Sequence, residues 1–240
     1  MDGGIILNCL SRLSQITTKI KVMWHRRKEP YIISAKFGIL YLVMPNSALD
    51  FHIVENGILN DWAATQMYKL IPQNGIIFDI GANVGLLTLP FARIYVPKGV
   101  VYAYEPVFQY VCQLQINTEI NQLNNVVVLP IALQNDLNID QSSLYVRRAV
   151  EGAEFKVLQG GEHTHNKHLP IVQYECSTII DDLTNCPNGI NCFNFMRDLV
   201  YKQYEIVNEK YLTEFSDPKR HMPGSNIICF HNSKIPEKIL

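Results

Sequence analysis

The sequence predicts an α/β fold whose core is a mostly parallel sheet of seven strands. Apolar runs of strand length alternate with segments of helical period from residue 76 to residue 230. Some of these runs, such as residues 126–129, are continuously apolar, which is typical of parallel strands buried on both faces. The run at residues 76–80 ends in a glycine-containing turn that leads into a helical pattern, as a βαβ unit begins. We therefore expect one main α/β domain.

An N-terminal extension, residues 1–54, precedes the expected main domain, residues 55–240. Residues 1–28 place apolar side chains at helical spacing and end in a basic cluster, His25-Arg26-Arg27-Lys28. This pattern predicts a helix with a solvated basic end. Contact with a membrane surface or with a phosphate group is the alternative role of the cluster.

The other elements are expected in a regular order along the chain. A short hairpin is expected at residues 31–35 and 38–44, and a helix at residues 61–70. The seven core strands are expected at residues 76–80, 100–105, 126–133, 144–149, 170–176, 204–207 and 225–230. Helices are expected to about residue 95, at residues 107–121, before Gly160-Gly161, and at residues 193–202. Pro90 lacks a backbone donor, so the first core helix must begin late enough to hold it in the first turn.

Composition limits the possible functions. The chain has 240 residues, 48% of them hydrophobic, which suffices for the core of one α/β domain with a modest extension. A net charge of −1 gives no overall field for nucleic acid or an anionic membrane, and no segment has the apolar length of a membrane span. The six cysteines lack Cys-x-x-Cys spacing and no Asn-x-Ser/Thr site occurs, so we expect a cytoplasmic protein.

The most informative segment is the turn after the first core strand, Asp79-Ile80-Gly81-Ala82-Asn83-Val84-Gly85. The second core strand ends in Tyr104-Glu105-Pro106. An acid at the tip of the second strand of a βαβ unit can accept hydrogen bonds from both ribose hydroxyls of a nucleoside. The two motifs together predict a nucleoside-binding crevice. The alternative is a βα turn whose glycines serve only close packing.

The spacing of this turn favours S-adenosylmethionine over a dinucleotide. The dinucleotide motif Gly-x-Gly-x-x-Gly lets a pyrophosphate lie against bare backbone at a helix N-terminus, and here the third glycine position does not fit. Asp79, before the first glycine, would repel a phosphate but suits a ligand with an ammonium group. S-adenosylmethionine combines adenosine with a sulfonium and an amino-acid tail. An NAD-linked reductase is the alternative.

The candidate donor-binding residues have distinct expected roles. We assign Asp79 to the methionine end of the donor and Glu105 to its ribose. The backbone of Gly81 and Gly85 allows the close approach of the ligand. Ala132, beyond the third strand, is expected near the adenine.

Two further acids are candidates for the acceptor side. Methyl transfer to an oxygen is helped by a group that takes the proton of the acceptor. Ligands of open α/β sheets bind outside the carboxyl ends of the strands, where Glu151 and Glu175 are expected. Either acid is a candidate for orienting the acceptor or accepting its proton. For Glu151 the alternative is an acid that complements the dipole of the following helix.

No metal site is expected. His163, His165 and His168 cluster in a predicted polar loop, where solvated histidines are commoner than ligands. Cys186 and Cys192 lack partners at ligand spacing. The chain has no Asp/Asn-Pro-Pro-aromatic tetrapeptide, which argues against methylation of a base amino group.

Four segments, residues 79–85, 104–106, 124–133 and 150–154, occur in the order seen in FkbM-type methyltransferases, which the chain resembles over about residues 55–230. The resemblance implies a Rossmann-like class I methyltransferase fold with S-adenosylmethionine as donor. It implies methylation of a hydroxyl on a sugar, a glycan or another small-molecule acceptor, and no nucleic acid is expected as a partner. The implied donor site comprises Asp79, Gly81, Ala82, Asn83, Gly85, Glu105, Pro106 and Ala132.

The chain departs from this family at two places. The family has Ile-Asp where this chain has Arg148-Ala149, so an acid is missing. The family also inserts a hairpin and a helix where this chain has only residues 134–143, although parallel strands need a connection of about a dozen residues or more. Either the connection is extended chain, or residues 144–148 are not the equivalent strand. The alternative function is therefore a degenerate, weakly active or inactive methyltransferase-like binding protein.

Overall fold

The chain divides into two compact units, Met1–Asn60 and Asp61–Leu240. The computed structural model describes residues 29–44, 70–133, 144–148, 153–176, 188–207, 211–218 and 225–236. The expected helix at residues 1–28, nearly all of the expected helix at 61–70, and Glu151 lie outside the described residues. The division falls between residues 60 and 61. The expected boundary between residues 54 and 55 stays a prediction.

The first unit contains the predicted hairpin. Strands β1 (Tyr31–Ser34) and β2 (Leu40–Val43) are antiparallel and are joined through the short helix η1 (Lys36–Gly38). Phe37 and Gly38 both have positive φ, which reverses the chain within a few residues. Alternate side chains of β2 are buried, as expected for a strand with one covered face.

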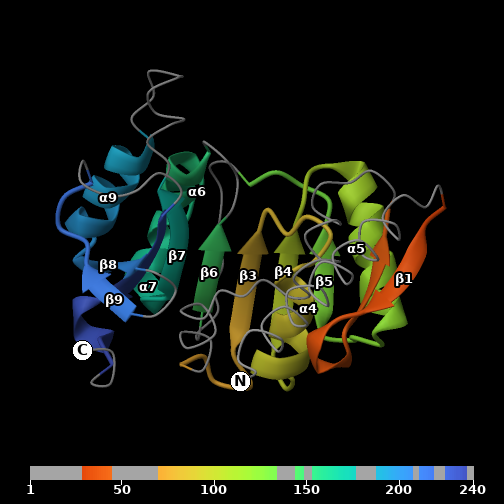
Figure 1. Cartoon of the computed structure of the whole chain (residues 1–240). Helices are drawn as coiled ribbons and strands as arrows, with labels where there is room; N and C mark the ends of the chain where they lie inside the picture. The colour runs from red at the N-terminus through yellow and green to blue at the C-terminus, as the bar shows by residue number, and fades with distance from the viewer. Residues whose placement is uncertain are drawn as a thin grey trace, which may run out of the picture. The chain divides into compact units, whose positions relative to one another are not determined.

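In the residues that the structure describes, the second unit is built on an eight-stranded sheet with the order β5-β4-β3-β6-β7-β10-β8-β9. Figure 1 shows β6, β3, β4 and β5 side by side. The strands of the sheet are β3 (Ile76–Ile80), β4 (Val100–Tyr104), β5 (Val126–Leu129), β6 (Leu144–Arg148), β7 (Ile171–Cys176), β8 (Tyr201–Val207), β9 (Tyr211–Glu214) and β10 (Ser225–His231). The first five strands in the order are parallel, and β10 is antiparallel to both of its neighbours. The expectation of a mostly parallel sheet is confirmed, but the count of seven is wrong because β9 pairs with β8 at the edge.

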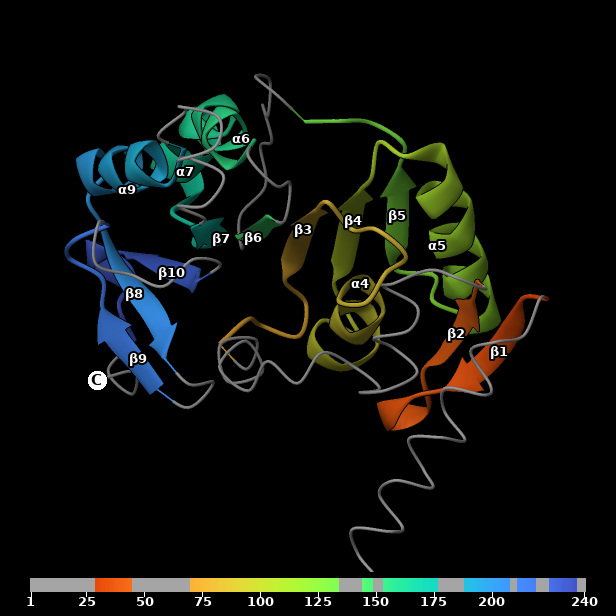
Figure 2. The same cartoon turned by 45° about the horizontal axis from the view of Figure 1, so that its top comes forward.

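Helices pack on both faces of the sheet. The helices described in this unit are α4 (Thr88–Pro90), η2 (Phe91–Tyr95), α5 (Phe108–Ile120), α6 (Glu154–Gly160), α7 (Glu162–His168), α9 (Asn188–Asp198) and η3 (Asn232–Lys234). Leu114 of α5 packs with Ala103 on one face, whereas Val157 of α6 packs with Phe78 and Ile80 on the other. Figure 2 shows α5 and α6 on these opposite sides. Helices therefore cover both faces of the parallel strands, as the continuously apolar sequences of these strands require.

Some element boundaries differ from those expected. Helix α4 begins at Thr88, so Pro90 does lie in the first turn, and the helix continues into η2 with wider π-type turns. Helix α9 spans Asn188–Asp198 rather than residues 193–202. Val200 has a φ of 64°, a left-handed conformation that ends the helical segment and lets β8 begin at Tyr201.

The connection into the central strand is longer than expected. Strand β5 ends at Leu129 instead of residue 133, so the chain has residues 130–143 in which to reach β6. This length meets the minimum for joining parallel strands. Strand β6 pairs in parallel with both β3 and β7. Residues 144–148 are therefore a central strand of the sheet.

Candidate functional site

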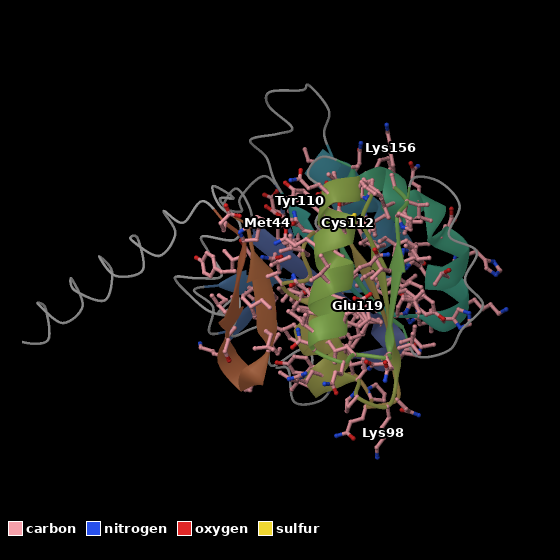
Figure 3. All side chains as sticks on the ribbon, turned by 90° about the vertical axis from the view of Figure 1, so that its right-hand side faces the viewer. Met44, Lys98, Tyr110, Cys112, Glu119 and Lys156 are labelled. Carbon is pink, nitrogen blue, oxygen red and sulfur yellow. The ribbon has the colours of Figure 1, made fainter. Side chains whose placement is uncertain are left out.

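The order of the sheet identifies the edge where a ligand would bind. The chain runs outward from β3 through β4 to β5 and then returns to the other side of β3 as β6. In open α/β sheets, ligands bind at this reversal, outside the carboxyl ends of the strands. The carboxyl ends of β3, β4 and β6 coincide, because Ile80 pairs with both Tyr104 and Arg148. In Figure 3, α5 runs lengthwise beside the sheet. Its residue Tyr110 lies toward the end of the sheet where Lys156 is labelled, and its residue Glu119 lies toward the opposite end, where Lys98 is labelled.

The predicted turn at residues 81–85 lies at this edge and has an unusual backbone. Gly81, Asn83 and Gly85 have φ values of 79°, 51° and 95°. Asparagine is among the few residues other than glycine that tolerate this conformation. At Gly85 an added Cβ atom would lie 2.6 Å from Cδ1 of Leu114, so that buried side chain would have to shift, and the positive φ itself favours glycine.

Every backbone N–H of this turn is already bonded within the protein. Gly81 and Ala82 both donate to the carbonyl of Tyr104, at 2.9 and 3.0 Å. The other bonds of the turn run from Asn83 N to Glu105 Oε2 at 2.8 Å, from Val84 N to Asn83 Oδ1 at 2.8 Å, and from Gly85 N to the Ala82 carbonyl at 3.0 Å. The backbone of residues 81–85 therefore offers no unbonded N–H group to a ligand.

Glu105 is held rigidly at the tip of β4. One carboxylate oxygen accepts from Asn83 N and the other accepts from Val107 N at 2.9 Å. Its own N–H donates to the carbonyl of Leu129. Each carboxylate oxygen can accept more than one hydrogen bond, so both keep capacity for a second donor. Two fixed acceptors on one carboxylate match the paired hydroxyls of a ribose.

Asp79 has a more internal position than expected. Its side chain has no exposed surface, and its Oδ2 accepts a 2.6 Å hydrogen bond from the hydroxyl of Thr88. A bond this short between a hydroxyl and a carboxylate is strong and orients both groups. In this structure Asp79 therefore braces the turn against the start of α4. Its assignment to the methionine end of a ligand stays a prediction.

The sequence did not predict two residues that support the turn, Thr88 and Asn117. Besides Thr88, the buried amide of Asn117 on α5 donates to the carbonyl of Val84 at 2.9 Å. Both are polar side chains within apolar helical stripes, and a buried polar side chain is normally hydrogen-bonded. That signal was available in the sequence, although the partner of each residue was not.

Apolar side chains line the same edge beyond Glu105. Val107, Phe108 and Ile131 are 46%, 77% and 48% exposed, and Pro106 and Ala132 are also exposed. These residues follow the carboxyl ends of β4 and β5, beside the buried Tyr104. Burial, reinforced by the neighbouring Tyr102, raises the pKa of Tyr104 to about 12, so this phenol is neutral at physiological pH. The edge thus combines one fixed carboxylate with an apolar rim.

The predicted acceptor-side acid lies apart from this cluster. Glu175 is half-buried near the carboxyl end of β7 and pairs in register with Asn226 of β10. The amide of Gln173, two residues earlier, donates to Asn226 Oδ1 at 3.0 Å. Strands β4 and β7 are separated by β3 and β6, so at roughly 4.8 Å per strand the two ends lie about 14 Å apart. The structure places Glu175 on the same edge as Glu105 but does not bring the two together.

The histidine cluster is in a helix, so the prediction of a polar loop is wrong. Helix α7 spans Glu162–His168, and His165 is buried against Tyr201, whose hydroxyl donates to its carbonyl at 3.3 Å. Within the part of the chain that the structure describes, no three His, Cys, Asp or Glu side chains are grouped to hold a metal ion. No helix among those described is long and apolar enough to cross a membrane.

Comparison with known proteins gives similarity at the level of fold. No family model matches the chain, and no curated protein sequence gives a significant match. A SAM-dependent O-methyltransferase from Thermotoga maritima has a similar structure, with a TM-score of 0.51, 16% identity, and coverage of 86% of this chain and 79% of that one. A tRNA (uracil-54, C5)-methyltransferase from Pyrococcus abyssi, solved with S-adenosyl-L-homocysteine, has a TM-score of 0.51 and 14% identity. That match covers 84% of this chain and 44% of the larger protein.

A methyltransferase FkbM from Methylobacillus flagellatus is also similar, at a TM-score of 0.46 and 13% identity, covering 68% of this chain and 48% of that one. A structural similarity this weak does not show that two proteins belong to one family, so membership of the FkbM family stays a prediction. The expectation that nucleic acid is not a partner is not supported either, because one of the similar structures is a tRNA methyltransferase. The fold prediction is confirmed: the chain has a Rossmann-like methyltransferase fold.

Proposed function

We propose that this protein is an S-adenosylmethionine-dependent methyltransferase. The observation that carries the proposal is the Glu105 carboxylate, fixed by Asn83 N and Val107 N at the carboxyl edge of the sheet. A carboxylate in this place suits the two ribose hydroxyls of a nucleoside. The exposed apolar side chains beyond Glu105, including those next to Pro106 and Ala132, suit the flat face of an adenine.

The closed backbone of the turn favours this donor over a dinucleotide. A pyrophosphate is bound through N–H groups that point at it from a glycine-rich turn and a helix N-terminus. Here the N–H groups from Gly81 to Gly85 are all bonded within the protein. NAD is therefore a poor match.

The chain's own residues would act mainly by positioning. The donor supplies an activated methyl group on a positively charged sulfur. Glu105 would fix the ribose, and Gly81, Ala82, Asn83 and Gly85 would form the wall beside it. Alignment of donor and acceptor for an in-line transfer can be worth an effective concentration of about 10⁵ M or more. Asp79 would act at the amino-acid end of the donor, through the turn that it braces.

We further propose that the acceptor is a hydroxyl of a sugar, a glycan or another small molecule, and that Glu175 or Glu151 takes its proton. Glu175 supports this assignment by its place on the carboxyl edge, beyond β6 from the donor side. Replacing Glu175 by Gln keeps the shape of the side chain and removes the base. Turnover should then fall by about 10²-fold or more while donor affinity is unchanged. Undiminished turnover would exclude Glu175 as the base.

Calorimetric titration with S-adenosylmethionine and S-adenosylhomocysteine tests the proposal. We expect micromolar binding of both ligands by the wild-type protein, and loss of about tenfold or more of this affinity in Glu105→Ala. Glu119→Ala is the matched control, because Glu119 is an exposed acid on α5, the helix that follows Glu105 in the chain. Failure of well-folded wild-type protein to bind either ligand would refute the proposal. Binding without any methylated product in an acceptor screen with labelled donor would favour the degenerate alternative.

A further inference from the structure

Two consecutive arginines end the central strand β6 at the carboxyl edge of the sheet. The Cα atoms of Arg147 and Arg148 pair in register with those of Asp79 and Ile80 on β3. Neighbouring strands lie about 4.8 Å apart, and residues that pair in a parallel ladder stand on the same face of the sheet. Successive residues of one strand stand on opposite faces, so the two arginines belong to different faces.

The face of Arg147 holds a buried acid. Asp79 stands beside Arg147 in the ladder, and its side chain has no exposed surface. Ala103, the partner of Asp79 on β4, packs against Leu114, so this is the face that α5 covers. The hydroxyl of Thr88 gives the Asp79 carboxylate a hydrogen bond but no opposite charge. A buried carboxylate is stable only where hydrogen bonds and an opposite charge compensate for its lost hydration.

The face of Arg148 also holds a buried acid, at the start of α6. Val157 of this helix packs with Ile80 and Tyr104, the paired last residues of β3 and β4. Ile80 is also the register partner of Arg148, so Arg148 stands on the face that α6 covers. Glu154 lies one helical turn before Val157 on the same side of the helix and is 3% exposed. The chain enters α6 from the carboxyl end of β6, so Glu154 lies toward that end of the sheet.

We infer that Arg147 and Arg148 are positioning residues, Arg147 as the counter-ion of Asp79 and Arg148 as the counter-ion of Glu154. Each face of the sheet then holds one buried acid and one cation at the end of the same strand, so the charges of each face are balanced. Arginine suits both places, because its guanidinium is always charged and donates to a carboxylate in a planar fork.

The two ion pairs join the end of β6 to different parts of the candidate site. Arg147 acts through Asp79, which braces the turn at residues 81–85, so its loss should weaken donor binding. Arg148 acts through Glu154 on the opposite face, so its loss should leave donor binding nearly unchanged. The link to donor binding rests on the proposed function, whereas the two ion pairs do not.

Double-mutant cycles measured by urea unfolding test the two pairs. Asp79→Asn, Glu154→Gln, Arg147→Met and Arg148→Met each remove one charge at similar size. Each single variant should raise the unfolding equilibrium constant by about 10²-fold, because it leaves a buried charge unpaired. The doubles Asp79→Asn/Arg147→Met and Glu154→Gln/Arg148→Met leave no charge unpaired. Their effect should therefore be smaller than the product of the single effects by about tenfold or more.

The swapped doubles are matched controls, because they combine positions on opposite faces of the sheet. Asp79→Asn with Arg148→Met, and Glu154→Gln with Arg147→Met, should be additive to within about twofold. Additive effects in both matched pairs, or equal coupling in all four combinations, would overturn the inference. If a single variant fails to fold, its matched double should fold, and failure of that rescue would overturn the inference too.

Calorimetric titration with S-adenosylhomocysteine separates a positioning role from a loss of stability alone. Arg147→Met should lower the affinity by about tenfold, whereas Arg147→Lys keeps the charge and should retain most of it. The affinity of Arg148→Met should stay within about twofold of wild type. A larger loss in Arg148→Met than in Arg147→Met would overturn the assignment of the two faces. If wild-type protein binds no donor, the proposed function fails, and the unfolding cycles still decide whether the two pairs exist.

Discussion

The two halves of the sheet use buried polar groups in different ways. Around β3, β4 and α5, the side chains of Asn117 and Thr88 donate hydrogen bonds to the turn at residues 81–85 or its base, Asp79, and the Glu105 carboxylate accepts one from the turn. Around β7, β8 and β10, the buried polar groups bond one another inside the core. The hydroxyl of Tyr174 donates to Gln203, and the amide of Gln203 donates to the carbonyl of Phe193.

The buried polar groups of the first half, around β3 and β4, therefore shape the candidate site, whereas those of the second half, around β7, β8 and β10, stabilise a core. The core cluster of the second half contains three buried thiols, those of Cys176, Cys192 and Cys229. Burial is the main cause that raises the pKa of Tyr174, and the neighbouring thiols add to it. Substitutions in the first half should therefore change stability and donor affinity together, whereas those in the core of the second half should change stability alone.

The largest effect is expected for Gly85→Ala in the first half. The new methyl group would collide with Leu114, and the left-handed φ adds strain, so the free energy of unfolding should fall by about 3 kcal/mol. Donor affinity should be lost with it. Gly38→Ala is the control for strain alone, because no atom lies within 4 Å of its added Cβ, and it should cost about 1 kcal/mol. Equal losses in urea unfolding would show that the contact with Leu114 is unimportant.

Thr88→Val should have the next largest effect. It removes the hydroxyl bonded to the buried carboxylate of Asp79 and leaves a methyl group of similar size, at a cost of about 2 kcal/mol. Because this bond braces the turn, donor affinity should fall several-fold as well. Thr88→Ser keeps the hydroxyl and should retain most of both properties. A loss of stability without any loss of affinity would contradict the link between this bond and the site.

Tyr174→Phe tests the second half. It removes the buried hydrogen bond to Gln203 and should lower the free energy of unfolding by about 1 kcal/mol. Donor affinity in the titration should be unchanged, because Tyr174 is fully buried and lies on β7, three strands along the sheet from β4 and Glu105. A change in affinity comparable to that of Thr88→Val would break the distinction between the two halves.

The smallest effect at neutral pH is expected for Tyr104→Phe, at about 0.5 kcal/mol or less. The pKa of Tyr104 is raised to about 12 in the folded protein, against about 10 when the chain is unfolded. The folded state therefore holds this proton more tightly, and its contribution to stability is complete below pH 10 and lost between about pH 10 and 12. Urea unfolding across that range should show a shallower pH dependence for the variant. An identical slope would contradict the raised pKa.

The sequence predicted the first half of the sheet well because its information is local. The strand at residues 76–80, the positive-φ turn and the acid at Glu105 lie within one βαβ unit, and each follows from residue type and spacing. The hydrogen bond from Asn83 to Glu105 was not predicted, although both residues were named. Such a bond depends on the three-dimensional path of the turn, which spacing does not specify.

The second half was less predictable because its boundaries are set by tertiary packing. Helix α9 is displaced and β9 adds an edge strand, neither of which follows from local periodicity. The histidines of α7 illustrate the same limit. Their polar segment suggested a loop, but burial of His165 against Tyr201 holds it as a helix. Packing of this kind is invisible to a window of neighbouring residues.

The turn at residues 81–85 has its backbone hydrogen bonds complete before any ligand arrives. A nucleoside that enters therefore meets a preformed wall, and little conformational entropy is lost in ordering it. The rate of association should then be limited by diffusion and orientation and not by a rearrangement of the turn. Ligands of this site would differ mainly in residence time, that is, in how slowly each one departs.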